Sequence, residues 1–309
     1  MEGTASVRCG DDLRGRVPGE YFCLADPVCQ GPVQAGSLPE YLSRRAVFVA
    51  GHYGPDLAAV RSRLGTEYTA LRGLAAYSRI LLWFEHDLWD QAVLIRLLSL
   101  LADMPVLAGR LYLMPADGRR SFPDLPQGEL EALAPEPLPW SAVEAGAEAW
   151  RAFASPDPTA LDRLSRRALP LPHLARAMRR HLQDLPWVTD GLGLTERMMM
   201  QAIAEGARDE AALFRQLRPA DQVFHFTDLI VRDLLKRLST STRRLVSRDA
   251  PHALTPRGAA ILAGEERYVP PPRFHAGVVV GPGGGWWWHP RAAGVTDVPP
   301  GRRAMGLFG

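Results

Sequence analysis

The chain contains 309 residues, of which 47% are apolar and 23% charged. This composition supplies enough apolar material for buried cores and predicts two domains rather than one. The 36 basic residues nearly balance the 34 acidic residues, so overall charge gives no reason to expect binding to nucleic acid or membranes. The longest apolar run, around Val93–Leu101, is too short to span a bilayer, and we expect no membrane segment.

The cysteines are Cys9, Cys23 and Cys29, all in the first tenth of the chain. Their number is odd and they form no CxxC pair, and we expect no signal peptide before them. This pattern predicts free thiols and a cytoplasmic protein.

Residues 1–118 are predicted to form a Rossmann-like α/β domain with a mostly parallel sheet, because strand and helix patterns alternate. The expected strands are Ser6–Cys9, Tyr21–Ala25, Arg79–Phe84 and Val106–Leu113, and the expected helices are Leu38–Ala50, Pro55–Ala76 and Leu88–Ala102. The continuous apolar run within Arg79–Phe84 is typical of an interior parallel strand that is covered on both faces.

Residues 119–190 are predicted to form a helical connector, and residues 191–309 a winged-helix-like domain. Three helices, over Thr195–Glu205, Glu210–Gln216 and Thr227–Leu238, precede a short hairpin of Leu245–Ser247 with Ala253–Thr255. This order of elements is that of a winged helix-turn-helix.

The end of the domain contains glycine-rich and tryptophan-rich segments. Val278–Val280 and Trp286–Trp288 are expected to pair as a hairpin across Gly281–Gly285. The stretch after Pro290 is expected to be a flexible tail.

Several short motifs lie at the ends of the predicted strands and helices. They are Gly10-Asp11-Asp12-Leu13, Asp26-Pro27 with Gly31-Pro32, the ten residues of Leu82–Gln91 (LWFEHDLWDQ), Pro156-Asp157-Pro158, Arg180-His181-Leu182, Gly191–Arg197 and Leu254–Gly258. Together they make nearly the whole chain resemble the bacterial DUF1835 family, from whose pattern the chain departs at Trp287–His289. The resemblance implies the same fold and domain order, and it implies no activity.

Acidic side chains follow three strands of the predicted sheet, where open parallel sheets bind their ligands. The catalytic candidates are Glu85, His86 and Asp87, and the ligand-binding candidates are Asp11, Asp12, Asp26, Asp90, Gln91, Arg45 and Arg110. Repulsion among so many carboxylates would raise some of their pKa values unless a cation were bound. Oxygen donors without paired histidines favour Mg²⁺, for which Asp11, Asp26 and Asp87 are the candidate ligands. His86 could act as a general acid or base.

The same aspartates have a purely structural interpretation. Asp12 could cap a first helix, Asp26 could form an Asx turn before Pro27, and Asp87 could cap the helix that begins at Leu88. Capping explains Glu85 and His86 less well, because neither residue type is a preferred cap.

Common nucleotide-binding and hydrolase motifs do not occur. Gly10 stands alone without GxGxxG spacing, and the chain contains neither a GK[ST] phosphate loop nor GxSxG.

The sequence leaves open whether the protein is an enzyme. Our leading hypothesis is an enzyme or ligand-binding protein that acts on a small polar or phosphorylated molecule at the acidic strand edge, with Mg²⁺ as a candidate cofactor. The alternative is a ligand-sensing transcriptional regulator that binds DNA through its winged helix. The DNA-binding candidates of that alternative are Lys236, Arg237, Arg243 and Arg244.

Overall fold

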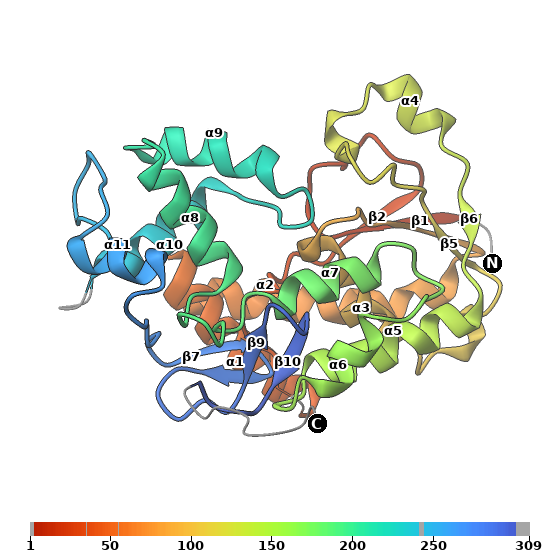
Figure 1. Cartoon of the computed structure of the whole chain (residues 1–309). Coiled ribbons are helices and arrows are strands. Elements are labelled where there is room, and N and C mark those ends of the chain that lie inside the picture. The colour runs from red at the N-terminus through yellow and green to blue at the C-terminus, as the bar shows by residue number, and fades with distance from the viewer. Residues whose placement is uncertain (1–2, 35, 55, 241–243, 301–309) are drawn as a thin grey trace. The chain divides into compact units, whose positions relative to one another are not determined.

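The computed structural model describes residues 3–34, 36–54, 56–240 and 244–300 (Figure 1). The chain divides into two compact units. Unit 1 contains residues 1–178 and 274–278, and unit 2 contains residues 179–273 and 279–309. This division differs from the predicted three-part organisation, since residues 119–190 are shared between the two units.

Unit 1 is built on a five-stranded sheet with the strand order β2-β1-β4-β5-β6. The strands are β1 (Thr4–Arg8), β2 (Glu20–Cys23), β4 (Arg79–Trp83), β5 (Leu111–Leu113) and β6 (Glu136–Pro137). Strands β2, β1, β4 and β5 are parallel, and β6 is antiparallel to β5. The predicted α/β fold with a mostly parallel sheet is thus confirmed, as is the interior position of β4 between β1 and β5.

One predicted helix and one predicted strand of unit 1 differ from the structure, and the unit contains the following helices. They are α1 (Leu38–Tyr53), α2 (Leu57–Ala70), α3 (Leu88–Leu101), α4 (Gln127–Ala132), α5 (Trp140–Phe153), α6 (Thr159–Leu164) and the first half of α7 (Leu174–Leu182). The expected helix 55–76 is α2 followed by a 3-10 turn over Leu71–Ala76. The expected strand 106–113 begins only at Leu111, because Pro105 starts a 3-10 turn and Gly109 has a φ of 78°.

Helix α3 is the central helix of unit 1 and is buried along almost its whole length. Figure 1 shows α3 and α5 side by side. Their close approach requires a glycine at position 146, because a Cβ there would lie 2.7 Å from Cβ of Leu98 and 2.4 Å from its Cδ1. The acidic N-terminus of α3 is thus held on a rigid, well-packed helix.

Unit 2 contains the three helices that were expected there. They are α8 (Leu194–Ala204), α9 (Glu210–Ala220) and α10 (Asp228–Ser239), and a fourth helix, α11 (Pro256–Ala263), follows. Each of α9 and α10 begins at a capping side chain, Asp209 or Thr227. Val246 and Leu254 form an antiparallel bridge where the hairpin was expected.

The predicted pairing of Val278–Val280 with Trp286–Trp288 is wrong. Strand β8 (Val278–Val280) instead belongs to a three-stranded sheet of order β3-β7-β8, with β3 (Gly31–Pro32) and β7 (Arg273–Ala276). Strand β9 (Trp287–His289) pairs antiparallel with β10 (Gly294–Thr296). The turn at Pro290 therefore closes a hairpin where a flexible tail was expected, and the end of that predicted tail, residues 301–309, lies outside the described residues.

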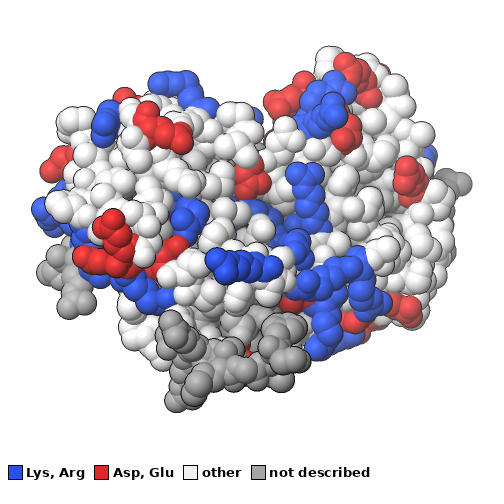
Figure 2. All heavy atoms as spheres, viewed as in Figure 1, with Lys and Arg blue, Asp and Glu red and all other residues white. Residues whose placement is uncertain are grey.

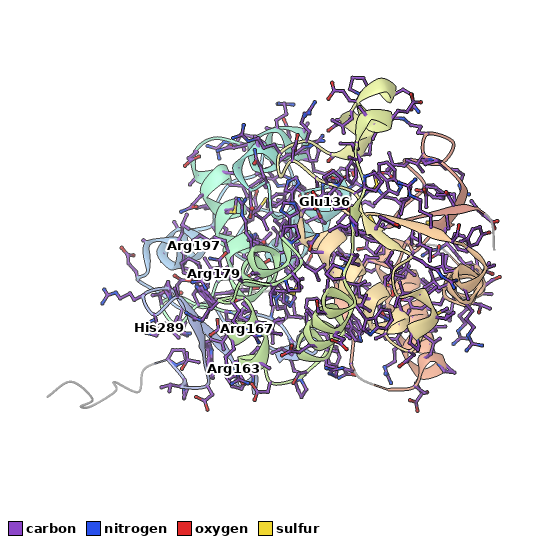
Figure 3. All side chains as sticks on the ribbon, turned by 90° about the vertical axis from the view of Figure 1, so that its right-hand side faces the viewer. Glu136, Arg163, Arg167, Arg179, Arg197 and His289 are labelled. Carbon is purple, nitrogen blue, oxygen red and sulfur yellow. The ribbon has the colours of Figure 1, made fainter. Side chains whose placement is uncertain are left out.

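Two tryptophans of unit 2 have arginines stacked against them. The guanidinium carbon of Arg179 lies 5.6 Å from the ring centroid of Trp288, and that of Arg197 lies 4.6 Å from the ring of Trp187. Figure 3 labels both arginines. Trp288 is buried, so it contributes to the core of this hairpin.

Among the described residues, no helix combines the length and the apolar character that crossing a bilayer requires.

The contact between α3 and α5 gives a stability prediction. Replacing Gly146 by alanine should overpack this contact and lower the free energy of unfolding by roughly 1–3 kcal/mol. The control is Gly128→Ala in the exposed helix α4, where an added Cβ meets no atom within 4 Å, and it should leave stability unchanged or raise it by up to about 1 kcal/mol. Urea denaturation measures both effects, and equal stability of the two variants would contradict the packing argument.

Candidate functional site

The strand order of unit 1 reverses between β1 and β4. The chain runs from β1 to its neighbour β2, and then crosses back to β4 on the other side of β1. In open parallel sheets, such a reversal opens a crevice at the carboxyl ends of the two strands, where ligands bind. The residues that follow the two strands, beginning at Cys9 and at Phe84, therefore occupy the expected position of a site.

Arg8, the last residue of β1, is the centre of an ion-pair network there and is 4% exposed. Its Nη1 donates to Asp90 Oδ2 at 2.5 Å and to the Trp83 carbonyl at 3.1 Å. Its Nη2 donates to Glu85 Oε1 at 2.7 Å and to Asp12 Oδ2 at 2.9 Å. This guanidinium joins the end of β1 to the turn between β4 and α3.

The N-terminus of α3 positions the acids around Arg8. Asp87 is the N-cap, and its Oδ1 accepts from the Asp90 backbone N–H at 3.0 Å. Asp90 Oδ2 accepts from the Glu85 N–H at 2.6 Å, and Gln91 Nε2 donates to the Glu85 carbonyl at 2.5 Å. The helix dipole adds positive potential at this end, which favours carboxylates. We refer to Asp12, Glu85, Asp87 and Asp90 as the acidic cluster.

The acidic cluster has more carboxyl groups than Arg8 can neutralise. Burial raises the pKa of Glu85 to about 7, with a further contribution from Asp90. Burial, again with Asp90, raises the pKa of Asp87 well above its ordinary value. Glu85 therefore exchanges its proton near neutral pH, and Asp87 keeps its proton to a higher pH than an exposed aspartate does.

Cys9 belongs to the same network. Its Sγ donates to Asp90 Oδ1 at 2.7 Å. Burial and the charge of Asp90 raise the pKa of the thiol well above its ordinary value. A protonated thiol is a poor nucleophile, so Cys9 acts here as a hydrogen-bond donor.

His86 has a different environment from the acids beside it. It is 7% exposed, and its ring centroid lies 6.0 Å from that of His173 in a T-shaped arrangement. Burial, together with the charges of His173 and Arg176, lowers its pKa, so the imidazole is neutral near pH 7. Among the described residues, the buried His86 Nδ1 and Gln91 Oε1 have no hydrogen-bond partner.

The segment after β5 packs against Glu85 of the acidic cluster. The Phe122 backbone N–H donates to Glu85 Oε1 at 3.0 Å. The Phe122 ring packs edge-on against Trp83 at a centroid distance of 5.3 Å, and Arg8 lies 5.8 Å from its centroid. This packing keeps water from the Glu85 carboxyl.

Three of the sequence-predicted residues lie elsewhere in unit 1. Asp11 is exposed and pairs with Arg14 at 2.6 Å. Asp26 is fully buried and pairs with Arg45 at 2.7 Å, and Arg45 Nη2 also donates to the Pro27 carbonyl. The structure therefore brings Glu85, His86, Asp87, Asp90, Gln91 and Asp12 together, but it does not place Asp11, Asp26 or Arg45 in the acidic cluster.

The last ligand-binding candidate, Arg110, donates through Nη1 to the Ala75 carbonyl. This contact ties the start of β5 to the 3-10 turn over Leu71–Ala76. It gives Arg110 a structural role.

Of the three proposed caps, only Asp87 caps a helix. Asp12 follows a strand whose continuation forms turns rather than a helix, and it pairs with Arg8. The Asp26 side chain binds Arg45 and two tyrosine hydroxyls rather than its own turn. The capping interpretation thus accounts for only one of the three aspartates.

The structure gives the Mg²⁺ prediction a different set of ligands. Glu85, Asp87 and Asp90 each offer an oxygen, and the three oxygens lie within 4.8 Å of one another. These donors suit a hard cation, but the Arg8 guanidinium already binds Glu85 and Asp90 and would repel a second cation. Mg²⁺ binding stays a prediction.

The sequence analysis missed Arg8, Phe122 and the Cys9 hydrogen bond. The sequence contained one sign of the role of Arg8, which is a charged residue at the last position of a buried strand. A charge at such a position needs a partner near the sheet edge, where the acids were already expected.

In unit 2, the DNA-binding candidates differ in exposure. Lys236 and Arg244 are exposed, whereas Arg237 is half-buried and pairs with Glu196 at 3.5 Å. Arg243 lies outside the described residues. On the face of unit 2 visible in Figure 2, acidic and basic groups are intermixed.

The pKa of Glu85 gives a pH-dependent prediction. A carboxyl whose pKa is about 7 when folded and near 4.5 when unfolded makes the folded protein lose roughly 2–3 kcal/mol as the pH rises from about 4.5 to 7. Glu85→Gln should flatten this decrease, whereas Glu144→Gln, at an exposed position of α5, should keep the wild-type profile. The raised pKa of Asp87 also makes stability fall as the pH rises, whereas the lowered pKa of His86 makes it increase. Both contributions are present in the wild type and in each variant, so the comparison isolates Glu85.

Urea unfolding at a series of pH values measures these profiles. Parallel profiles for the wild type and Glu85→Gln would show that Glu85 is ionised in the folded protein at pH 5 and would remove it as a proton-exchanging group.

Comparison of the chain with protein-family models, with curated proteins and with solved structures finds no match. The resemblance to the DUF1835 family therefore stays a prediction. The function has to be inferred from the geometry of the candidate site.

Proposed function

We propose that unit 1 is a Rossmann-like domain that binds a small polar or phosphorylated molecule at the carboxyl ends of β1 and β4, and that His86 and Glu85 transfer protons to and from it. The observation that carries this proposal is the pair of buried polar atoms without a partner among the described residues, His86 Nδ1 and Gln91 Oε1. Buried polar atoms almost always have hydrogen-bond partners. A bound ligand at this strand reversal would supply them.

The two proton-transfer groups are suited to work near neutral pH. Burial raises the pKa of Glu85 to about 7 and lowers that of His86, so near neutral pH Glu85 is partly protonated and His86 is a neutral imidazole. General acids and bases are most effective when their pKa lies near the working pH. His86 would accept a proton as a neutral imidazole, while the protonated fraction of Glu85 could donate one.

The surroundings of His86 favour a ligand with negative charge. Arg176 is exposed and His173 is partly buried, and both lie close enough to affect the pKa of His86. A guanidinium beside two imidazoles suits a phosphate or carboxylate group. Asp117 is also near and would exclude ligands with high negative charge.

A ligand screen by thermal shift tests this proposal. Wild-type protein and His86→Asn would be screened against sugar phosphates, nucleotides and small carboxylic acids, with Glu144→Gln as the control. A molecule that binds the site should raise the melting temperature of the wild type and of the control, and should raise that of His86→Asn much less. Equal stabilisation of all three proteins by every active compound would place binding elsewhere and contradict the proposal.

A magnesium series in the same assay tests the cation prediction. If the Arg8 guanidinium takes the place of a metal ion among these carboxyl groups, 10 mM MgCl₂ should change the melting temperature no more than NaCl of equal ionic strength. A rise that is specific to Mg²⁺ and absent in Asp87→Asn would instead show a metal held by the acidic cluster.

DNA binding by unit 2 is the second candidate function, and the order of its elements favours it. Helices α8, α9 and α10 are followed by the Val246–Leu254 bridge, as in a winged-helix-like domain. Lys236 and Arg244 are exposed and are the remaining candidates for phosphate contacts, because Arg237 pairs with Glu196.

Replacing Lys236 and Arg244 together by alanine should weaken DNA binding at least about tenfold and reduce its dependence on salt. Arg291→Ala, at an exposed position beside β9, is the matched control and should bind like the wild type. Fluorescence anisotropy with random duplex DNA at low salt measures this effect. Wild-type protein that shows no binding under these conditions would exclude the regulator.

A further inference from the structure

Arg96 of α3 lies inside an aromatic cage formed by Tyr41 of α1, Tyr68 of α2 and Trp150 of α5. Its guanidinium carbon lies 4.2 Å from the ring centroid of Tyr41, 4.8 Å from that of Trp150 and 5.3 Å from that of Tyr68. The residue is 8% exposed. Three elements of unit 1 thus hold this guanidinium in one place.

The polar contacts of Arg96 within the described part of the chain are incomplete. No carboxylate of the described residues forms an ion pair with it, and its Nε is buried without a hydrogen-bond partner. Arginine stays charged in proteins and carries five N–H donors. Aromatic faces offset part of the cost of burying this charge, but they do not accept its hydrogen bonds in the plane of the group.

The acid closest to the cage by contact is already neutralised. Asp26 accepts from the hydroxyls of Tyr41 at 2.7 Å and Tyr68 at 2.9 Å. Its charge is matched by the fully buried Arg45, at 2.7 Å. The guanidinium groups of Arg45 and Arg96 and the carboxylate of Asp26 therefore leave this buried region with one positive charge in excess.

We propose that Arg96 and its aromatic cage form a binding site for an oxyanion, namely the carboxylate or phosphate group of a small molecule. The planar fork of a guanidinium matches both groups. The rings fix its orientation in advance, which lowers the entropy cost of binding. This site is separate from the acidic cluster, and it does not depend on proton transfer by His86 and Glu85.

The test compares sodium phosphate, sodium acetate and sodium chloride at equal ionic strength. Phosphate or acetate should raise the melting temperature of the wild type by a few degrees relative to chloride, saturably with concentration. Arg96→Met, which keeps the side chain long and removes its charge, should lose this rise. Arg61→Met, at an exposed position of α2, is the matched control and should keep it.

The variant His86→Asn distinguishes this proposal from the proposed function. A rise that persists in His86→Asn and is lost in Arg96→Met places the anion at the cage. A rise that persists in Arg96→Met, or no rise in the wild type, overturns the proposal, even if the candidate site near His86 binds its own ligand.

A measurement on the wild-type fold covers the case in which Arg96→Met does not fold. Protein labelled with 5-fluorotryptophan gives a ¹⁹F resonance for Trp150, which Trp150→Phe assigns. Saturable phosphate or acetate titration should shift this resonance, because the ring contacts Arg96. A resonance that does not move at concentrations up to 100 mM would overturn the proposal.

Discussion

The burial of the Arg8 charge at the end of β1 is the constraint on which the site depends. A guanidinium that is 4% exposed has to be matched by acids, and the chain supplies them from Asp12 and from the N-terminus of α3. Because Arg8 binds both Glu85 and Asp90, it fixes β1 to the start of α3. The turn that carries His86 is thereby held in place, and loss of the guanidinium would leave several buried carboxyls without a counterion.

Unit 1 contains two charged regions of opposite sign. The acidic cluster has an excess of carboxyl groups, and burial raises the pKa values of Glu85 and Asp87. The region of Asp26, Arg45 and Arg96 has an excess of positive charge. The thiol of Cys29 is influenced by both regions. Burial is the main cause of its raised pKa, Asp87 raises this pKa further, and Arg45 lowers it.

Local patterns in the sequence predicted the sheet and part of the site. The other site residues were not predicted, because their partners are far away in the sequence. The apolar run within Arg79–Phe84 indicated an interior strand, because a parallel strand that is covered on both faces has such a run. Glu85, Asp87 and Asp90 were found because they are neighbours in the chain. Arg8 was missed because Glu85 and Asp90 lie 77 and 82 residues away from it.

The positions of Asp11 and Asp26 could not be predicted from spacing, since each is decided by which arginine pairs with it. Asp11 pairs at the surface with Arg14, which is near it in the sequence, whereas Asp26 pairs in the core with Arg45 of α1. Residues 119–178, the larger part of the predicted connector, belong to unit 1 in the structure. Helix α5 packs against α3 through Gly146, a contact that no periodicity in the connector indicates.

The outer edge of the five-stranded sheet ends in β6, which has only two residues, Glu136 and Pro137. Both are exposed, and they pair with Leu113 and Tyr112 of β5; Figure 3 labels Glu136. A proline has no N–H to offer a further strand, and a charged neighbour disfavours the stacking of chains. Pairing of this edge with a strand of a second molecule is therefore disfavoured, and so is aggregation through the edge.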